Sequence, residues 1–508
     1  MAYQFGTNWS FFSEFAGSIT GPLLTYEVLT AFFLEAGFLG VMLFGWNRVG
    51  EKLHYFATCM VALGTLMSTF WILASNSWMQ TPQGHEVING VVVPVDWFAV
   101  IFNPSFPYRL LHMTTAAFLA SAFFIAASAA WHLLRGNKSG AMKKMFSMSL
   151  WLIVVLAPLQ ALIGDAHGLN TLKHQPVKVA AMEGHWENKP GEATPLILFG
   201  IPDNAQEKTR YAVEIPGLAS LILTHSLDKQ VPALTEFPPE DRPDNVFAVF
   251  WSFRVMVGFG MLMLLAAALS LWLRYRGRLY DSRPFQRFML WMAPSGLIAI
   301  LAGWFVTEIG RQPWVVYGLQ RTTDAVSAHG EMHMSISLLI FFIVYGSVFG
   351  IGYIYMMKLI RKGIAPGGVS WAFDLPLIWF VIIIFSTLMY IVMDGFDLGI
   401  GILYPFVKSN ADRDLMMNSV APVWDGNETW LVLGGAALFG AFPLAYAVIL
   451  DALAIPLTLM LVALIFRGVA FEFRFKADEH HRYFWDRAFL ISSVIATFVQ
   501  GVVVGQRD

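Results

Sequence analysis

Long apolar runs separated by shorter polar segments dominate this chain. Most runs contain about 20 residues, which is the length that an α-helix needs to cross a bilayer. The pattern therefore predicts an all-α polytopic membrane protein with about eleven transmembrane helices in two bundles. The runs lie near 23–45, 55–77, 110–134, 148–164, 246–273, 287–309, 334–358, 375–393, 429–450, 455–473 and 488–505.

The polar segments predict an orientation and a division of the chain. Three basic loops, and the basic stretch from Lys358 to Lys362, fall on one side if the first seven helices alternate, and this is the cytoplasmic side by the positive-inside rule. The sizeable segment 165–245 then lies outside. A Pro- and Gly-containing linker at 364–374 divides a first block, 1–363, from a second, 375–508. The basic loops are 46–54, 135–145 and 274–287.

Composition narrows the class further. Only 13% of the residues are charged, which is about half the fraction of a soluble globular protein. The net charge of −2 indicates no nucleic-acid partner. The single cysteine excludes a disulfide framework and any cluster held by several cysteines.

Candidate chemistry is strongest at 303–314, where an apolar run closes. Ionisable residues at a membrane boundary are costly and usually mark a working site. On a continuous helix, Trp304, Glu308 and Arg311 stand at positions i, i+4 and i+7 and share one face. A ring, a carboxylate and a guanidinium on one face predict a redox or ion-handling centre.

A second candidate combines His112, at the start of one apolar run, with Met256 in another. Histidine and methionine together form a haem ligand set of electron-transfer proteins, and Arg254 is placed to pair with a haem propionate. The alternative is an interfacial histidine and one of 24 methionines in ordinary apolar packing.

Carboxylates inside or beside the apolar runs supply a third set of candidates. Glu27 and Glu35 share one run, and they suggest a proton path or a ligand set, although Glu27 could instead snorkel to the interface. Asp394, Asp397, Asp425 and Glu428 lie at two neighbouring run boundaries in the second block, where they could cap helices or handle protons. In the outer segment, Lys178 and Glu183 are by themselves a weak signal.

Together these motifs resemble subunit I of the cytochrome bd family of quinol oxidases, in particular its short-loop, cyanide-insensitive type. The resemblance covers residues 1 to about 363, and the second block is similar to the start of subunit II. The first-block motifs are Gln-Phe-Gly-Thr-Asn-Trp (4–9), Ala-Phe-Phe-Leu-Glu (31–35), Trp-Met-Gln-Thr-Pro (78–82), Lys-Val-Ala-Ala-Met-Glu (178–183) and Gly-Arg-Gln-Pro-Trp (310–314). The second-block motifs are Met-Asp-Gly-Phe-Asp-Leu-Gly-Ile-Gly-Ile-Leu (393–403) and Trp-Asp-Gly-Asn-Glu-Thr-Trp (424–430).

The resemblance implies specific roles for these residues. His112 and Met256 would be the axial ligands of a low-spin haem b, which Arg254 helps to hold. Glu308 would ligate a high-spin haem b, with Trp304 and Arg311 beside it. Lys178 and Glu183 would take part in quinol oxidation. Glu27 and Glu35 would line the di-haem pocket. The proton path would include Ser68, Asp425, Asp394 and Asp397.

The implied activity is oxidation of quinol at the outer face and reduction of oxygen to water, which builds a proton gradient without pumping in a bacterial inner membrane. The implied partners are quinol, oxygen, lipid, the remainder of subunit II or a separate subunit II, and a small accessory subunit. The family's subunit I opens with two further helices, one bearing a histidine ligand of haem d. We therefore expect the reading frame to extend upstream, and haem d or a further haem b to bind if that histidine is supplied. The alternatives are a catalytically incomplete remnant that binds haem b and a proton- or ion-coupled transporter.

Overall fold

The structure is a computed structural model that describes residues 8–45, 49–189, 191–328, 330–362, 375–420 and 424–505. It is built almost entirely of helices, as the apolar pattern predicts. Nine helices in this described part are long and apolar enough to cross a membrane, which is fewer than the eleven expected. The predicted linker at 364–374 lies outside the described residues.

Two of the expected spans are interrupted. The run near 23–45 forms helix α2 (Ser10–Glu27), a π-helical turn (Val28–Phe32) and helix α3 (Phe33–Phe44). The run near 429–450 is divided between α16 (Trp424–Ala441) and α17 (Pro443–Lys476). Proline stands in the first turn of α17, where its missing N–H costs no hydrogen bond, so the chain ends one helix and begins another there.

The chain folds as two compact units, which we describe separately. The large unit comprises the described residues of 9–27 and 69–365, and the small unit comprises those of 1–8, 28–68 and 366–508. Helix α4 (Glu51–Gln80) contributes its first part to the small unit and its last part to the large one. That a linker at 364–374 divides the chain into a first and a second block stays a prediction, because these residues lie outside the described part.

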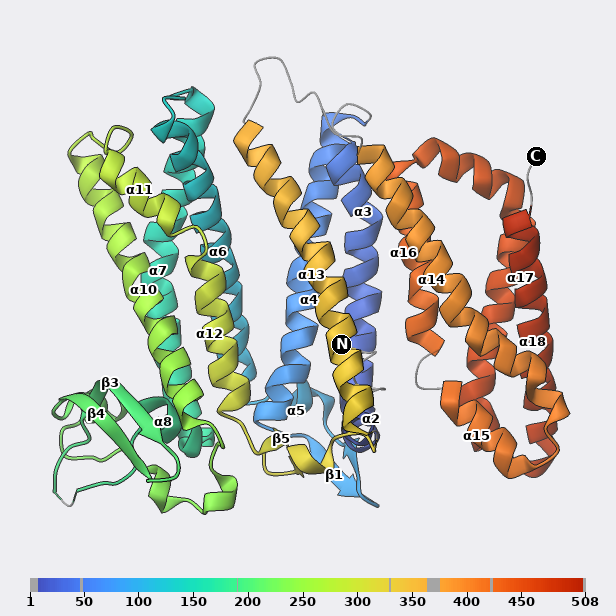
Figure 1. Ribbon diagram of the computed structural model, residues 1–508, viewed down its shortest axis with the longest axis horizontal. Helices are drawn as coiled ribbons and strands as arrows, with labels where there is room; N and C mark the ends of the chain where they lie inside the picture. Colours follow the sequence, from blue (N-terminus) through green and yellow to red (C-terminus); the bar gives the residue numbers. More distant parts are fainter. Residues whose placement is uncertain are drawn as a thin grey trace. The chain divides into compact units, whose positions relative to one another are not determined.

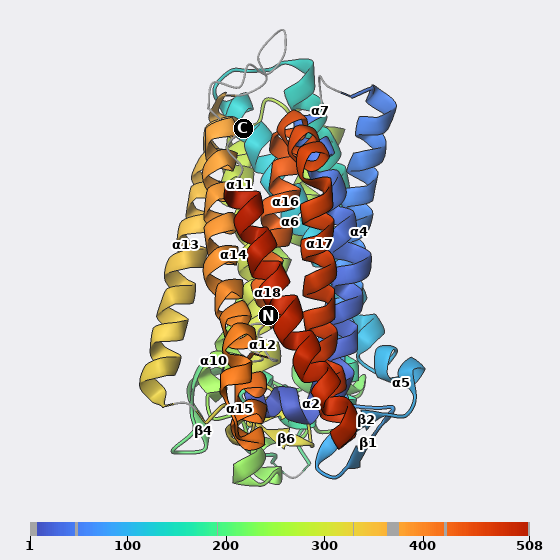
Figure 2. The same ribbon diagram turned by 90° about the vertical axis from the view of Figure 1, so that its right-hand side faces the viewer.

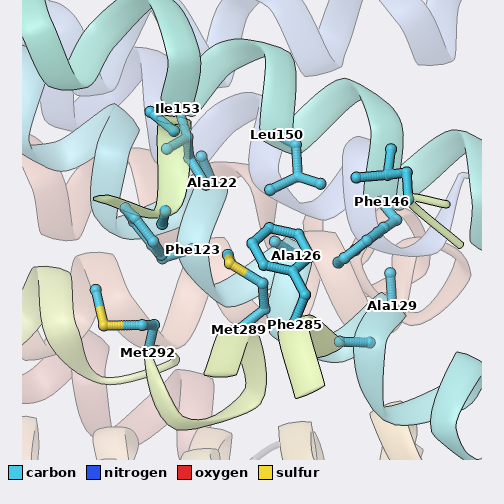
Figure 3. Packing of buried hydrophobic residues seen from close by; sticks show 14 of the residues in the cluster. Ala122, Phe123, Ala126, Ala129, Phe146, Leu150, Ile153, Phe285, Met289 and Met292 are labelled. Atoms are coloured by element: carbon cyan, nitrogen blue, oxygen red, sulfur yellow. The ribbon is translucent and has the colours of Figure 1, made fainter. Parts of the chain in front are cut away.

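Five helices form the main bundle of the large unit (Figure 1). Three of them meet in a core, to which α6 and α7 each present residues at positions i, i+4 and i+7, the spacing of one helix face, and α11 presents residues at i and i+4 (Figure 3). The small stripe Ala122, Ala126 and Ala129 on α6 lets the larger side chains of α7 and α11 pack closely against it. The helices are α6 (Phe106–Leu134), α7 (Gly140–His174), α10 (Val246–Tyr275), α11 (Arg283–Trp291) and α12 (Ser295–Ile309). The larger core residues are Phe146, Leu150 and Ile153 on α7, Phe285 and Met289 on α11, and Met292 directly after α11.

A glycine sets the distance between α12 and α6. A Cβ atom built on Gly296 would lie 2.3 Å from Cα of Ala120 and 2.5 Å from its Cβ. Real Cβ atoms do not approach other atoms so closely, so this crossing needs glycine. The close approach places the end of α12 beside the first turns of α6.

Short hairpins and helices lie at one end of this bundle (Figure 1). The predicted outer segment 165–245 begins later than expected, because α7 continues to His174, and the rest of it carries α8, the β3–β4 hairpin and α9. The elements are β1 (His85–Ile88), β2 (Val91–Pro94), α5 (Trp97–Ile101), α8 (Pro176–Glu183), β3 (Leu196–Asp203), β4 (Lys208–Ile215), α9 (Leu218–Thr224), β5 (Trp314–Val316) and β6 (Gln320–Arg321). Each hairpin is antiparallel. The remaining elements of the large unit are the long helix α13 (Glu331–Lys362) and 3₁₀ turns at Leu234–Glu236, Pro239–Asp241 and Thr322–Asp324.

The small unit packs four helices of the second block around one another (Figure 2). Helix α14 contacts α16 and α18, and α17 lies along α18. Their apolar core includes Leu398, Leu464 and Ala496. The elements not yet given are α14 (Leu375–Leu403), a 3₁₀ turn (Tyr404–Phe406), α15 (Asn410–Val420) and α18 (Glu479–Gly505).

Candidate functional site

The short helix α8 carries two of the predicted site residues, Lys178 in its first turn and Glu183 at its end. Both side chains are buried, with 4% and 5% of their residue surface exposed. The helix stops at Gly184, which adopts φ +64°, and a Cβ there would meet the Phe250 ring at 2.7 Å. Glycine at this position therefore both ends α8 and lets it pack directly on α10.

Lys178 lies against the end of α12. Its Nζ donates a hydrogen bond to Gln80 Oε1 at 2.7 Å, and its side chain covers Gly310, where a Cβ would come within 2.9 Å of Lys178 Cγ. Burial, followed by the positive charges of Arg109 and Arg311, lowers the pKa of Lys178 well below its usual value. Near neutral pH the neutral amine is thus favoured far more than in water.

Glu308 is the centre of a polar network contributed by three helices and one loop. Asn76 on α4 donates to Glu308 Oε1 at 3.1 Å, and Arg311 donates to the other carboxylate oxygen. Arg109 on α6 in turn donates to Asn76 Oδ1. The network thus holds Glu308 from the α6 side through Asn76 and from its own loop through Arg311.

This region carries more positive than negative charge. Arg109, Arg311 and Lys178 surround the single carboxylate of Glu308, since all of these groups interact electrostatically with one another. Two guanidinium nitrogens of this group, Arg109 Nε and Arg311 Nη1, are buried and have no hydrogen-bond partner among the described residues. Buried N–H groups of this kind are normally paired, so the arrangement suits a bound anionic group.

Glu183, at the other end of α8, pairs with Arg254 on α10. The Arg254 Nη2 to Glu183 Oε2 distance is 3.3 Å, and the same guanidinium donates to the carbonyl oxygens of Met182 and Ile197. Burial raises the pKa of the Glu183 carboxyl, and the neighbouring Arg254 offsets part of that rise. Helix α8 is therefore attached at one end to α12 and at the other to α10.

His112 and Met256 lie on different helices of the same bundle, and each faces a glycine on a neighbouring helix. A Cβ on Gly164 of α7 would lie 3.4 Å from His112 Cε1, and a Cβ on Gly303 of α12 would lie 2.9 Å from Met256 Sδ. The amide nitrogen of Gln160 lies 3.3 Å from both ring nitrogens of His112.

Comparison with known proteins decides the family. The model of cytochrome bd terminal oxidase subunit I matches residues 1–364, and that of subunit II matches residues 375–507. The chain belongs to the cytochrome bd terminal oxidase family. It combines regions of both subunits in one polypeptide, as the motifs predicted.

Individual relatives agree with this assignment. The chain is 33% identical over 426 residues to cytochrome bd-II ubiquinol oxidase subunit 1 of Escherichia coli, covering 70% of this chain and 82% of that protein. It is 35% identical to cytochrome bd ubiquinol oxidase subunit 1 of Bacillus subtilis, covering 67% and 77%. For cytochrome bd-I ubiquinol oxidase subunit 2 of E. coli the identity is 38%, but the match covers only 35% of that protein and 26% of this chain.

A solved structure shows the same fold. The bd oxidase from Geobacillus thermodenitrificans aligns with a TM-score of 0.65 and 31% identity, over 71% of this chain and 82% of that one. This chain is therefore a multi-pass component of a quinol oxidase in the bacterial inner membrane, and its relatives and fold are those of cytochrome bd ubiquinol oxidase subunits.

Within this bd-type chain, Trp304 and Glu308 share a face of α12 at positions i and i+4, but Arg311 does not extend that face as expected. Helix α12 ends at Ile309, so Arg311 lies in the following turn and folds back onto Glu308. Arg311 is 5% exposed whereas Trp304 is 57% exposed and stacks on Phe305. The prediction was wrong for Arg311, because it assumed a continuous helix through Gly310.

The predicted acids of the first run are separated by the π-helical turn. Glu27 ends α2 in the large unit, and Glu35 lies in α3 of the small unit. Glu35 packs on α4, where a Cβ at Gly64 would lie 2.6 Å from its Cγ. Ser68 is one turn further along the same face of α4, so these two proton-path candidates lie on adjoining helices.

In the second block, Asp394 and Asp397 are both fully buried in the small unit. The backbone of Asp425 belongs to α16, but its side chain lies outside the described residues. The sequence prediction did not include Arg109, Asn76 or Gln80. Arg109 and Asn76 each lie at the edge of an apolar run, and that position is the signal that could have found them.

Proposed function

We propose that this chain oxidises quinol at the outer face of the inner membrane and reduces oxygen to water at a haem site, so that a proton gradient forms without pumping. The observation that carries the proposal is the position of α8. Its Lys178 end contacts the segment of Glu308 and Arg311, and its Glu183 end pairs with Arg254, two residues before Met256. One short helix thus joins the proposed quinol residues to both proposed haem-binding segments.

The residues present fit a haem. Imidazole, thioether and carboxylate groups are the side chains that hold haem iron in proteins, and His112 and Met256 each pack against a glycine of a neighbouring helix. We assign these two as the residues that would hold a low-spin haem b and Glu308 as the residue that would hold a high-spin haem b. Bound haem supplies reversible electron transfer and the reduction of oxygen.

The excess positive charge fits the carboxylate groups that a haem carries. The unpaired Nε of Arg109 and Nη1 of Arg311 are buried donors of the kind that bind carboxylates. Asn76 and Arg311 fix the two oxygens of Glu308, so the carboxylate has one preferred orientation. Arg254 is engaged with Glu183 and two backbone carbonyls, so its support of a haem goes through the position of α8 and α10.

The buried pair on α8 handles quinol. Oxidation of a quinol releases its electrons together with protons, so a nearby base is needed. The raised pKa of Glu183 makes its carboxylate a better proton acceptor than an exposed glutamate. The depressed pKa of Lys178 keeps its amine available as a neutral hydrogen-bonding group for a quinol oxygen.

For proton uptake we propose a route that includes Glu27 in the large unit and Glu35, Ser68, Asp425, Asp394 and Asp397 in the small unit. The packing of Glu35 on the α4 face that bears Ser68 supports the first part of this route. The burial of Asp394 and Asp397 supports the second part of this route. Burying an acid in a membrane protein costs free energy, and such acids usually have a function, for example in proton transport.

Substitution Met256→Leu tests the haem assignment. Leucine keeps the apolar volume but removes the sulfur ligand, so we expect loss of the low-spin haem signal from the reduced spectrum with unchanged expression. Met263→Leu, two turns away on the same helix and in the apolar core, is the matched control. An unchanged reduced spectrum in the Met256→Leu protein would sink the assignment.

A further inference from the structure

One face of α7 contacts the His112 side chain at three successive levels. Gln160, Gly164 and His167 stand at positions i, i+4 and i+7 of this helix, so these positions share one face. The amide nitrogen of Gln160 lies 3.3 Å from each ring nitrogen of His112, and a Cβ on Gly164 would lie 3.4 Å from His112 Cε1. The ring centroids of His167 and His112 are 5.4 Å apart, with the rings inclined at 61°. This face of α7 therefore surrounds one side of the imidazole.

The Gln160 amide has one unused hydrogen-bonding atom beside this ring. Its nitrogen donates to the backbone carbonyl oxygen of His112 at 3.1 Å. Its oxygen, Oε1, is buried and has no hydrogen-bond partner among the described residues. Because both atoms belong to the same amide group, this unpaired acceptor lies close to the imidazole. Buried polar atoms are normally paired, so Oε1 is available for a further donor.

The imidazole of His112 provides such a donor when its other nitrogen is engaged. Neutral imidazole has one N–H donor and one bare nitrogen, and the bare nitrogen is the one that binds a metal. A histidine that holds a haem therefore keeps an N–H on its second ring nitrogen. In metal sites this N–H almost always donates to a neighbouring oxygen, which fixes the ring orientation and makes the ligand more basic. His167 meets the His112 ring edge to face rather than through a hydrogen bond, so it does not take this place.

We propose that Gln160 is a positioning residue for His112, and that its Oε1 accepts a hydrogen bond from the ring nitrogen of His112 that does not hold the haem. The inference rests on the proposed function, because it takes His112 as a haem-holding residue. Gln160 then contacts His112 twice, at the backbone carbonyl through its amide nitrogen and at the ring through its oxygen.

Such a hydrogen bond has an effect of known sign on electron transfer. A more basic imidazole donates more electron density to the iron and so favours the oxidised state, which lowers the midpoint potential of the haem. Removal of the acceptor should therefore raise the midpoint potential.

A redox titration of the low-spin haem in the purified full chain tests the proposal. Gln160→Leu removes the acceptor at similar volume. We expect the ratio of reduced to oxidised haem at a given potential to rise about tenfold, which is a midpoint shift of about 59 mV for one electron. Ser149→Ala, eleven positions earlier on the same helix, removes a hydroxyl that bonds only to backbone carbonyls of α7, and this control should leave the potential unmoved. An unchanged or lowered potential in Gln160→Leu would overturn the proposal.

Gln160→Glu keeps the test decisive if leucine disturbs folding or haem binding. Glutamate has the same side-chain length and keeps an acceptor oxygen, so the low-spin haem should be retained with a midpoint potential equal to that of the wild type or lower. Loss of the low-spin haem from Gln160→Leu together with its retention in Gln160→Glu would also support the role of the acceptor. Loss from both variants, or a raised potential in Gln160→Glu, would contradict it.

Failure of the proposed function has a different signature. A wild-type chain without a low-spin haem b signal would exclude His112 as a haem-holding residue, and it would overturn that function and this inference together. A normal wild-type signal with an unchanged potential in Gln160→Leu would refute only the role of Gln160.

Discussion

Replacement of Asn76 by leucine gives the sharpest test of the network around Glu308. Leucine has a similar volume but removes the donor to Glu308, 3.1 Å away, and the acceptor used by Arg109. A hydrogen bond to a charged group contributes about 1.5–3 kcal/mol, and every 1.4 kcal/mol is about tenfold in affinity. Supporting partners of metal ligands have effects of about 10- to 100-fold, so we expect weakening of this order in haem binding at Glu308.

The assay measures the content of high-spin haem in the purified protein by pyridine haemochrome quantitation and by the reduced spectrum. The low-spin haem at His112 and Met256 should be retained, because neither residue belongs to the network. Thr58→Val on the same helix, where the hydroxyl bonds to His54 O at 2.9 Å, is the control and should keep both haems. If Asn76→Leu retains both haems with wild-type affinity, the proposed support of Glu308 is wrong.

Three further predictions concern α8 and the bundle. Lys178→Gln should lower quinol oxidation by about 10²-fold while the haem spectrum is unchanged, and loss of haem instead would show a structural role for Lys178. Arg254→Gln removes the positive charge that lowers the pKa of Glu183, so the acidic limb of the kcat/KM profile should move to higher pH; movement to lower pH would contradict this sign. Gly296→Val should lower the free energy of unfolding by about 1–3 kcal/mol, because its side chain has no room at the α6 crossing. Its control is Gly258→Ala in the interior of α10, whose Cβ meets no described atom within 4 Å and which should not lower the thermal transition.

Much of the fold follows from local sequence signals. The length and hydropathy of the apolar runs predict membrane helices because a bilayer imposes the same length on every crossing segment. The two interruptions were harder to foresee. The π-helical turn at Val28–Phe32 lies inside an uninterrupted apolar run, and its backbone geometry has no distinct residue pattern.

The candidate site, too, could be predicted from the sequence only in part. Glu308 and Arg311 stood out because ionisable residues at a run boundary are rare, and the structure brings them together. Their partners Asn76 and Arg109 lie 232 and 199 positions earlier in the sequence than Glu308, so their contact depends on how the helices pack. A single sequence holds no record of such long-range contacts.

Arg467 illustrates the same limit in the small unit. It stands in the middle of the apolar stretch of α17, where an arginine must find a partner, and Asp394 and Glu428 come from two other helices. Sequence analysis identified both acids as candidates. That Arg467 pairs with these two acids depends on the packing of α14, α16 and α17.

The most direct test of the central claim is a dithionite-reduced-minus-oxidised spectrum of the purified chain, with pyridine haemochrome quantitation. The account predicts haem b with the signal of His/Met ligation, lost in Met256→Leu. A purified, folded chain that binds no haem would contradict it, because His112, Met256 and Glu308 would then not be ligands.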